Sequence, residues 1–360
     1  MPTVCAPAIE VPGYQVTTRE LLETLADFYR GHPRLKVVLR VIAATTVRSR
    51  RYCHPLAEVL SSELSLGDRL RRHNEDAVTL AEAAAHDALL QAGISAQDID
   101  CLVVSSHSGH TMPGIDVALQ ARLGLPAGIR RVPVTQLGCA GGAWSIAFAA
   151  ELMLARPWGN ALVVCADVFS SGLHPDDTDM DGMIFKGLIG DAAGACVVRG
   201  DAEPLGMVMR ESWEYIVPGT RSVVGSRLEA DGVHGHNKVA LLEAVESAMP
   251  HLNKWLQDTC PPGGDAAPEF VVSHCGSPRI LDGIVEGLSV DPSLVRLSRE
   301  SLGEIGNVGG ASVLDVLSRT FDSPPEDGAQ GLLLAVGPGV AVVASRIEWR
   351  DGAAVPTGVR

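Results

Sequence analysis

The sequence predicts an α/β fold in which a mostly parallel sheet is covered by helices on both faces. Apolar segments of strand length alternate along the chain with longer segments whose apolar residues recur every three to four positions. Such alternation of strands and helices is typical of a parallel sheet buried between helices. Reactive residues flanked by glycine follow strands in both halves of the chain, which indicates two similar halves that meet with their chemistry at the seam.

The first half contains most of the predicted alternation. A strong amphipathic helix ends at Gly93, and a helix that begins near residue 140 stops before Pro157. The predicted elements are helices at 18–31, 34–44 and 73–94, a strand at 99–109, a helix at 117–125, a strand at 130–138, a helix at about 140–155, and strands at 160–170 and 191–201.

The second half repeats this pattern after a predicted boundary near 205–210. A long helix is followed by a strand that ends at a histidine, and glycines precede a later helix. The predicted elements are helices at 237–258 and 278–288, a strand at 270–276, a glycine-rich turn and helix within 303–321, and two closing strands within 328–349.

Composition limits the classes of function. The chain has 360 residues, of which 46% are hydrophobic and 20% charged, as in an ordinary globular protein. A net charge of -14 argues against nucleic acid or an anionic membrane as the main partner. We find no transmembrane segment, no signal peptide and no pair of cysteines with metal-site spacing, so we expect a cytoplasmic protein with reduced thiols and no metal.

Cys139 stands between a predicted strand and a predicted helix, with Gly138 before it and Gly141 and Gly142 after it. A thiol at a helix N-terminus experiences the positive end of the helix dipole, which favours the thiolate and hence nucleophilic reactivity. The glycines would let backbone and ligand approach closely. A buried cysteine that only fills space is the alternative. We accept that interpretation for six other cysteines, which are Cys5, Cys53, Cys101, Cys165, Cys196 and Cys260.

Two more residues stand at comparable positions in the second half. His274 ends an apolar strand beside Gly276, and Asn307 lies in a glycine-rich turn before a helix. A single histidine there is more often structural, and asparagine is a common turn or cap residue. Neither residue identifies a function by itself.

Taken together, the three segments resemble the type III polyketide synthases, the chalcone-synthase-like branch of the thiolase fold. The chain has "GCAGG" at the cysteine, "HCGSPRILD" at the histidine and "GNVGGAS" at the asparagine, in the family's order. The resemblance extends along the chain through "SGHTMPGID", "GLIGDAAGA" and "GPGVAV". It implies a five-layered αβαβα fold, with residues 1–208 carrying the nucleophile and residues 209–360 carrying the histidine and asparagine.

The resemblance also implies a reaction. Cys139, held as a thiolate by His274 and the helix terminus, would take an acyl starter from acyl-CoA as a thioester. His274 and Asn307 would donate hydrogen bonds to malonyl-CoA, stabilising the enolate formed on loss of CO₂, which then extends the chain by Claisen condensation. Cyclisation to an aromatic or pyrone product would follow. No cofactor is needed beyond the CoA substrates, and Met112 would reach the partner subunit in a homodimer.

The residues expected around the substrate depart from the plant members of the family. Ile189 and Gly235 stand where those enzymes carry phenylalanines, and Gly309 would widen the floor. We therefore hypothesise a pocket open to a longer or aliphatic starter; alternatively, Phe169 or Phe185 refills the space. His107 would lie in the pocket and orient or deprotonate an intermediate, or else serve only as part of the wall.

The predicted CoA site lies on the basic segment 35–52. Arg40 matches a basic position of the family, whereas Val37 and Ala44 replace lysines. Arg48, Arg50 and the adjacent Arg51 would then bind the phosphates of CoA, unless they form only a solvated basic turn. An acyl carrier protein could deliver the starter instead of free CoA.

Three other interpretations are open. A ketoacyl-synthase-III-like enzyme of the same fold would condense once or only transfer an acyl group. An inactive thiolase-fold partner subunit would be expected to lose one of the three residues, yet all are present. A papain-like hydrolase shares the residue types but not the α/β alternation. The starter, the number of extensions and the mode of cyclisation do not follow from the sequence.

Overall fold

A single mixed sheet connects the two halves in the computed structural model, which describes residues 1–200, 205–230, 232–238, 240–260 and 264–351. Within these residues the sheet has ten strands in the order β12-β13-β14-β9-β1-β8-β7-β5-β6, with β2 paired to β8. The strands are β1 (Thr3–Val4), β2 (Ala8–Glu10), β5 (Cys101–Ser105), β6 (Arg130–Val134), β7 (Asn160–Val168), β8 (Asp191–Arg199), β9 (Leu205–Ile216), β12 (Phe270–Ser273), β13 (Gln330–Gly337) and β14 (Ala341–Asp351).

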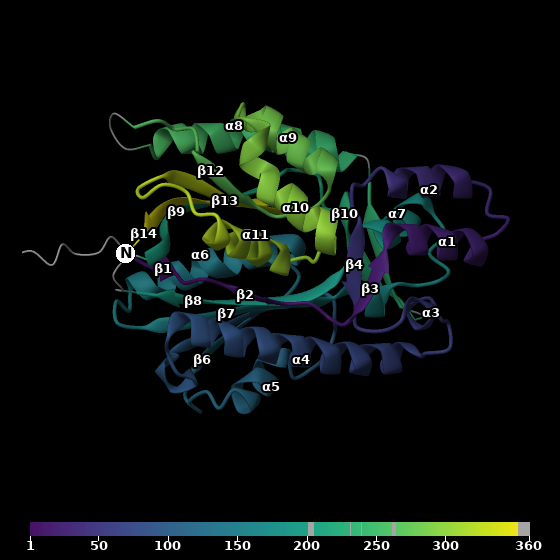
Figure 1. The fold of residues 1–360 in the computed structure, drawn as a ribbon, viewed down its shortest axis with the longest axis horizontal. Coiled ribbons are helices and arrows are strands. Elements are labelled where there is room, and N and C mark those ends of the chain that lie inside the picture. Colours follow the sequence, from purple (N-terminus) through teal and green to yellow (C-terminus); the bar gives the residue numbers. More distant parts are fainter. Residues whose placement is uncertain (201–204, 231, 239, 261–263, 352–360) are drawn as a thin grey trace, which may run out of the picture.

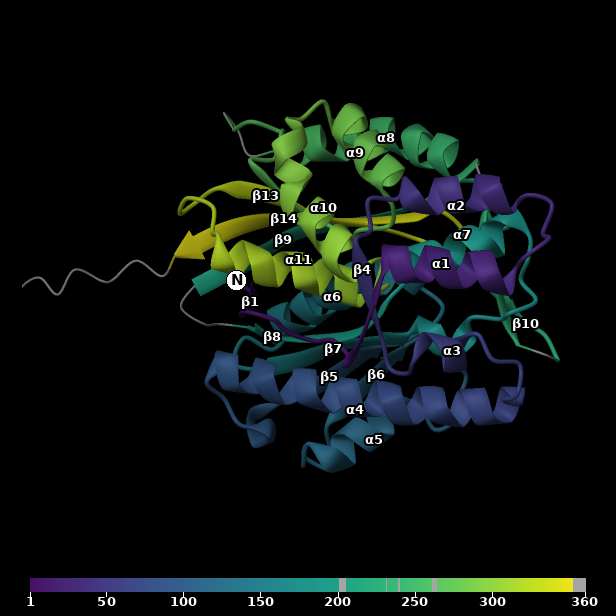
Figure 2. The same cartoon turned by 45° about the vertical axis from the view of Figure 1, so that its right-hand side comes forward.

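Helices and sheet alternate in five layers (Figures 1 and 2). Helices α4 and α5 cover the outer face of β5–β8, α6 and α11 fill the centre, and α8 and α9 cover the other part of the sheet. This confirms the predicted αβαβα fold. The helices are α4 (Leu66–Ala92), α5 (Ile115–Arg122), α6 (Gly141–Leu154), α8 (Ala240–Asp258), α9 (Pro278–Leu288), α10 (Arg296–Ile305) and α11 (Ala311–Asp322).

The prediction of a mostly parallel sheet is wrong. Only the pairs of β5 with β6, β5 with β7 and β12 with β13 are parallel within the described sheet. Strands β13 and β14 form an antiparallel pair because only the short turn 338–340 connects them. Strand β8 returns antiparallel to β7, and β1 pairs antiparallel with both β8 and β9 and so joins the two halves.

A smaller group of elements packs beside the layers, at the right in Figure 1. It buries apolar side chains that include Leu21, Leu25, Ile42, Tyr52 and Ile189. Much of it was not predicted from the sequence. Its elements are α1 (Thr18–Phe28), α2 (Leu35–Ala43), α3 (Leu56–Val59), α7 (Met180–Leu188), the antiparallel pair β3 (Tyr14–Thr17) and β4 (Ser49–Tyr52), and the hairpin β10 (Val224–Leu228) and β11 (Val233–Asn237).

Most predicted helices and strands are present with shifted ends. The helix predicted from residue 73 begins at Leu66, where the Ser65 side chain accepts a hydrogen bond from the backbone N–H of Asp68. It ends at Gly93, whose φ of 65° is left-handed. The boundary predicted at 208 falls inside β9, and the division into two halves stays a prediction.

The two central helices bring the candidate residues together. Helix α6 follows Cys139 directly, and α11 begins a few residues after Asn307. Their N-terminal ends approach closely, since a Cβ on Gly142 would lie 2.1 Å from the carbonyl oxygen of Gly310. A side chain at Gly142 would therefore separate the helices that carry the candidate site.

Candidate active site

Cys139 lies in the short 3₁₀ turn Gly138–Ala140 that leads into α6. Gly138 has φ 53°, and a Cβ there would lie 2.4 Å from the ring of Pro338. A Cβ on Gly141 would lie 2.2 Å from Ser105 Oγ. Both glycines are therefore needed for the turn that presents the thiol.

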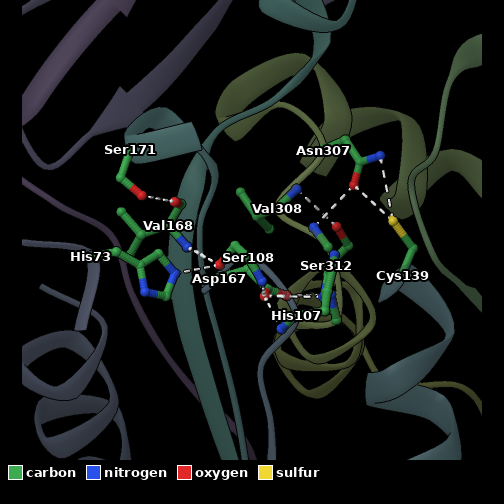
Figure 3. Close-up of polar contacts among 12 residues, drawn as sticks. His73, His107, Ser108, Cys139, Asp167, Val168, Ser171, Asn307, Val308 and Ser312 are labelled. Atoms are coloured by element: carbon green, nitrogen blue, oxygen red, sulfur yellow. Dashed lines mark hydrogen bonds and ion pairs between the residues drawn. The ribbon is translucent and has the colours of Figure 1, made fainter. Parts of the chain in front are cut away.

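Asn307 is fixed by backbone hydrogen bonds on both sides. Its N–H donates to the carbonyl of Leu188 at 2.8 Å, and its carbonyl accepts from Gly190 at 3.0 Å. The N–H of Gly309 donates to Asn307 Oδ1 at 3.0 Å and thereby orients the carboxamide. The carboxamide points toward Cys139, with Oδ1 and Nδ2 both 3.9 Å from Sγ (Figure 3).

His274 follows β12 and is buried. Its backbone N–H donates to Leu334 at 2.9 Å, and its Nε2 lies 3.3 Å from Asn307 Oδ1. Burial, together with the nearby His107, lowers the pKa of His274 to about 4, against the opposing effect of Asn307. The imidazole is therefore neutral at pH 7, and it can both donate and accept a proton.

The structure brings the three predicted residues into one contiguous group, with Asn307 in contact with both Cys139 and His274. The predicted thiolate is not supported. Burial and the Asp167 carboxylate raise the pKa of the Cys139 thiol to about 12, so the resting side chain is a neutral thiol. Among the described residues, no hydrogen bond joins Sγ to the His274 ring, because the carboxamide is the group that contacts the sulfur.

A second polar group lies next to these residues, centred on the buried Asp167 of β7 (Figure 3). Asp167 Oδ1 accepts the backbone N–H groups of His107 at 3.0 Å and Ser108 at 3.3 Å, and Oδ2 accepts that of Gly310 at 3.2 Å. His107 Nδ1 lies 3.0 Å from Oδ1. The sequence analysis missed Asp167, although an acidic residue near the end of an otherwise apolar strand was a visible signal.

Aromatic rings occupy much of the space around the predicted pocket residues. A Cβ on Gly235 would lie 3.6 Å from the Phe185 ring, and a Cβ on Gly309 would lie 3.0 Å from Phe169 and 2.9 Å from His107. Phe169 also packs edge-to-face against His107, at 5.1 Å between ring centroids. This geometry favours the alternative in which Phe169 and Phe185 refill the space, rather than a widened pocket.

Two other predicted pocket residues, Ile189 and Met112, differ in exposure. Ile189 is buried with the apolar side chains of α1 and α2, and only its backbone is bridged to Asn307. Met112 has 98% of its surface exposed. A role for Met112 therefore depends on a second subunit.

The three predicted CoA arginines differ in exposure. Arg40 is exposed on α2, and Arg48 is exposed and forms an ion pair with Glu304 at 3.4 Å. Arg50 is fully buried and donates to the carbonyl of Gly187 and to Thr18 Oγ1, so the prediction that it binds a CoA phosphate is wrong. The cause is the alternation of β4, which points residues 50 and 52 inward.

Two small pockets lie away from the three candidate residues. Both are lined in part by Arg69 and Ser171, and one of them reaches Ser108. In the described part of the chain, no group of three or more histidine, cysteine or acidic residues is placed to hold a metal ion. None of the described helices combines the length and the apolar character needed to cross a lipid bilayer.

Comparison with known proteins gives matches along nearly the whole chain. Residues 7–202 match the chalcone and stilbene synthases, N-terminal domain, and residues 209–347 match the C-terminal domain of the same family. The chain is 34% identical over 362 residues to 1,3,6,8-tetrahydroxynaphthalene synthase of Streptomyces coelicolor, covering 100% of this chain and 95% of that protein. It is 30% identical over 353 residues to phloroglucinol synthase of Pseudomonas fluorescens, covering 97% of this chain and 99% of that protein.

Solved structures give the same result. The crystal structure of 1,3,6,8-tetrahydroxynaphthalene synthase from Streptomyces coelicolor, described as a bacterial type III polyketide synthase, superposes with a TM-score of 0.93 at 33% identity, covering 97% of this chain and 99% of that chain. Germicidin synthase from the same organism, also a type III polyketide synthase, gives a TM-score of 0.89 at 28% identity, with the same coverage.

Proposed function

The chain belongs to the chalcone and stilbene synthase family and is a type III polyketide synthase, and from this premise we propose that Cys139, His274 and Asn307 are its catalytic residues. The observation that carries this proposal is the Asn307 carboxamide, which contacts both the Cys139 sulfur and the His274 ring. Cys139 belongs to the first proposed half of the chain, 1–208, and the other two residues belong to the second, 209–360. The site is then formed at the seam between the halves.

Loading begins from the neutral thiol. As Cys139 Sγ attacks the carbonyl of an acyl-CoA, the thiol proton passes to the neutral His274 imidazole. Asn307 contacts both side chains and holds them near each other. The C–S bond to CoA then breaks, and the CoA sulfur takes up the proton. The starter remains on Cys139 as a thioester.

Extension uses the same two partners as hydrogen-bond donors. His274 and the Asn307 amide donate to the thioester oxygen of malonyl-CoA, where negative charge develops as CO₂ leaves. The resulting enolate carbon attacks the Cys139 thioester, and the chain grows by two carbons with release of the cysteine sulfur. A donor pair aimed at a developing oxyanion contributes about 10²-fold or more to such a step.

We propose a small hydroxylated aromatic product made from malonyl-CoA and a short starter. The relatives named above are a tetrahydroxynaphthalene synthase and a phloroglucinol synthase. Ring closure of a chain with a carbonyl on every second carbon gives hydroxyl groups at alternating ring positions, as in the name 1,3,6,8-tetrahydroxynaphthalene. The rings of Phe169 and Phe185 beside Gly309 and Gly235 support a short starter over a long one.

The CoA moiety would bind at the basic end of α2. Arg40 and Arg48 are exposed there and can reach phosphate, whereas Arg50 cannot. The ion pair of Arg48 with Glu304 is exposed and therefore weak enough to exchange for a phosphate. An acyl carrier protein could present the same pantetheine-linked thioester.

We also propose a homodimer, in the cytoplasm. The apolar Met112 side chain is almost completely exposed in the single chain, which fits insertion into a second subunit. Light scattering of the purified protein measures the oligomeric state. A native protein with the mass of a single chain would contradict the dimer. Met112→Ala is expected to change the product distribution while leaving α4 and α5 folded.

The decisive experiment follows acylation and product together. Incubation with acetyl-CoA and malonyl-CoA is expected to place an acyl group on Cys139, detected by mass spectrometry of its peptide, and to release a product extended more than once. Cys139→Ala should abolish both signals. A product extended once would instead indicate a ketoacyl-synthase-III-like enzyme, and absence of any acyl group would indicate an inactive partner subunit.

A further inference from the structure

The His107 ring lies between Gly138, next to the nucleophile, and Gly309, two residues after the catalytic asparagine. A Cβ on Gly138, the neighbour of Cys139, would lie 3.8 Å from Cδ2 of the His107 ring. A Cβ on Gly309, two residues after Asn307, would lie 2.9 Å from Cε1 of the same ring. Since Nε2 is bonded to both of these ring carbons, it faces the gap between Gly138 and Gly309.

Asp167 fixes the other edge of the ring. The Asp167 carboxylate is fully buried and accepts the three backbone N–H groups described above, one of them from His107 itself. His107 Nδ1 lies 3.0 Å from Oδ1, too bent for a conventional hydrogen bond, so the interaction is mainly electrostatic. Burial would raise the pKa of Asp167, but the His107 ring and the backbone amides lower it below its usual value.

The two ring nitrogens are therefore unlike. The ionised carboxylate favours a proton on Nδ1, which leaves the lone pair on Nε2. Nε2 has no hydrogen-bond partner among the described residues, although the ring is 15% exposed and could contact a ligand. A neutral Nε2 with a carboxylate behind the ring is the arrangement of a general base.

We propose that His107 is a further catalytic acid–base residue of this enzyme, positioned by Asp167, and that it acts on the β-keto chain held on Cys139. This inference rests on the proposed function. In the step, Nε2 removes a proton from a methylene between two carbonyl groups, and the C–H electron pair forms an enolate. The enolate carbon bonds to a carbonyl carbon further along the chain, and the imidazolium returns the proton to the alkoxide, so nothing is oxidised, reduced or consumed.

Other titratable groups interact electrostatically with this pair. They are His73 of α4, Cys165 of β7, Cys139 and His274, and His110 in turn interacts with His73. Burial lowers the pKa of His73 to about 4, so His73 stays neutral at pH 7. The Nε2 of His73 is 2.7 Å from Ser108 Oγ (Figure 3).

The test separates loading from ring closure. His107→Gln removes the base while keeping a polar side chain, and Asp167→Asn removes the charge while keeping the shape. Each variant is incubated with acetyl-CoA and malonyl-CoA, the acyl group on Cys139 is measured by peptide mass spectrometry, and ring-closed and linear products are separated by chromatography. Asp116→Asn is the matched control, because Asp116 is another buried carboxylate with one cationic partner, Arg131, away from the site.

Both variants are expected still to carry an acyl group on Cys139, because the nucleophile is retained, and to show a ratio of ring-closed to linear products lowered by about 10²-fold, the usual share of a general base. Asp116→Asn should keep the wild-type ratio.

Two outcomes overturn the inference. If His107→Gln keeps the wild-type product ratio, His107 is part of the wall and the inference fails while the proposed function stands. If the wild type itself never carries an acyl group on Cys139, the proposed function fails and this inference fails with it. Should Asp167→Asn not fold, the His107→Gln ratio alone decides.

Discussion

Two buried aspartates, Asp167 and Asp191, show how neighbouring positions of one sheet acquire different chemistry. Asp167 lies near the end of β7 and Asp191 begins β8, and the two strands pair so that Val168 is opposite Asp191. Both side chains are inaccessible to solvent. Burial alone would raise the pKa of both carboxyl groups.

Their partners make the difference. Asp191 accepts hydrogen bonds from the N–H and hydroxyl of Ser170 and from the N–H of Cys53, and burial still raises its pKa to about 6. Asp167 has an imidazole as well as backbone amides, and its pKa falls below the usual value. The His107 imidazole therefore distinguishes a buried carboxyl group whose pKa is lowered, Asp167, from one whose pKa burial raises, Asp191.

The largest expected effect is a difference in product formation between variants of Cys139, near Asp167, and Cys53, which donates to Asp191. Cys139→Ala is expected to lower product formation by at least about 10³-fold, because the chain loses its covalent anchor. Cys53→Ala should leave the rate within about twofold, since alanine retains the backbone N–H that donates to Asp191 and Cys53 is not among the three proposed catalytic residues. Product formation per folded protein measures both variants, and equal losses would remove the distinction between the two regions.

The second effect concerns the reactivity of the resting thiol. Because burial and Asp167 raise the pKa of Cys139 to about 12, its alkylation by iodoacetamide should accelerate about tenfold per pH unit from pH 7 to 9, without a plateau. Mass spectrometry of the Cys139 peptide follows the rate. A rate that is already constant below pH 7 would show instead a thiolate stabilised by His274, as the sequence alone suggested.

The sequence predicted which three residues lie together better than it predicted their electrostatics. Cys139, His274 and Asn307 could be identified because each stands in a motif and each motif follows a predicted strand. The ionisation of Cys139 could not be predicted, because it depends on the burial of the thiol and then on Asp167, which is 28 positions away in sequence and comes near only in the folded chain. Charge interactions of this kind follow from tertiary distance and burial, which local patterns do not encode.

The fold shows the same limit. The helices and apolar strands of the layers were predicted because their periodicity is local. The sheet is mixed because β8 returns antiparallel to β7, β14 returns antiparallel to β13, and β1 joins β8 and β9 across the two halves. Arg50 was predicted to bind a CoA phosphate from its place in the basic segment 35–52, although the alternation of β4 buries it. Strand pairing and the inward face of a short strand depend on partners far away in sequence.

The pH dependence of stability should reveal the unusual pKa of Asp191. The carboxyl group has a higher pKa in the folded chain, about 6, than in the unfolded chain, about 3.9. The folded state therefore binds more protons between these values, and the free energy of unfolding should fall by on the order of 2 kcal/mol as the pH rises from 4 to 6. Urea denaturation of Asp191→Asn should lack this decrease, and an identical slope in the variant would contradict the assignment.

The smallest expected effect is the opposite behaviour of Asp167. Its pKa is lower in the folded chain, so its contribution to stability is present above the unfolded pKa of about 3.9 and is lost as the pH falls through the folded value. Urea denaturation between pH 5 and 3 should show a steeper loss for the wild type than for Asp167→Asn, because asparagine does not titrate. Since His107 contributes to the low pKa, His107→Gln should shift this loss of stability to higher pH, toward the behaviour of Asp191. If His107→Gln leaves the acid limb unchanged, the backbone amides alone hold the charge on Asp167, and the imidazole is not what separates the two aspartates.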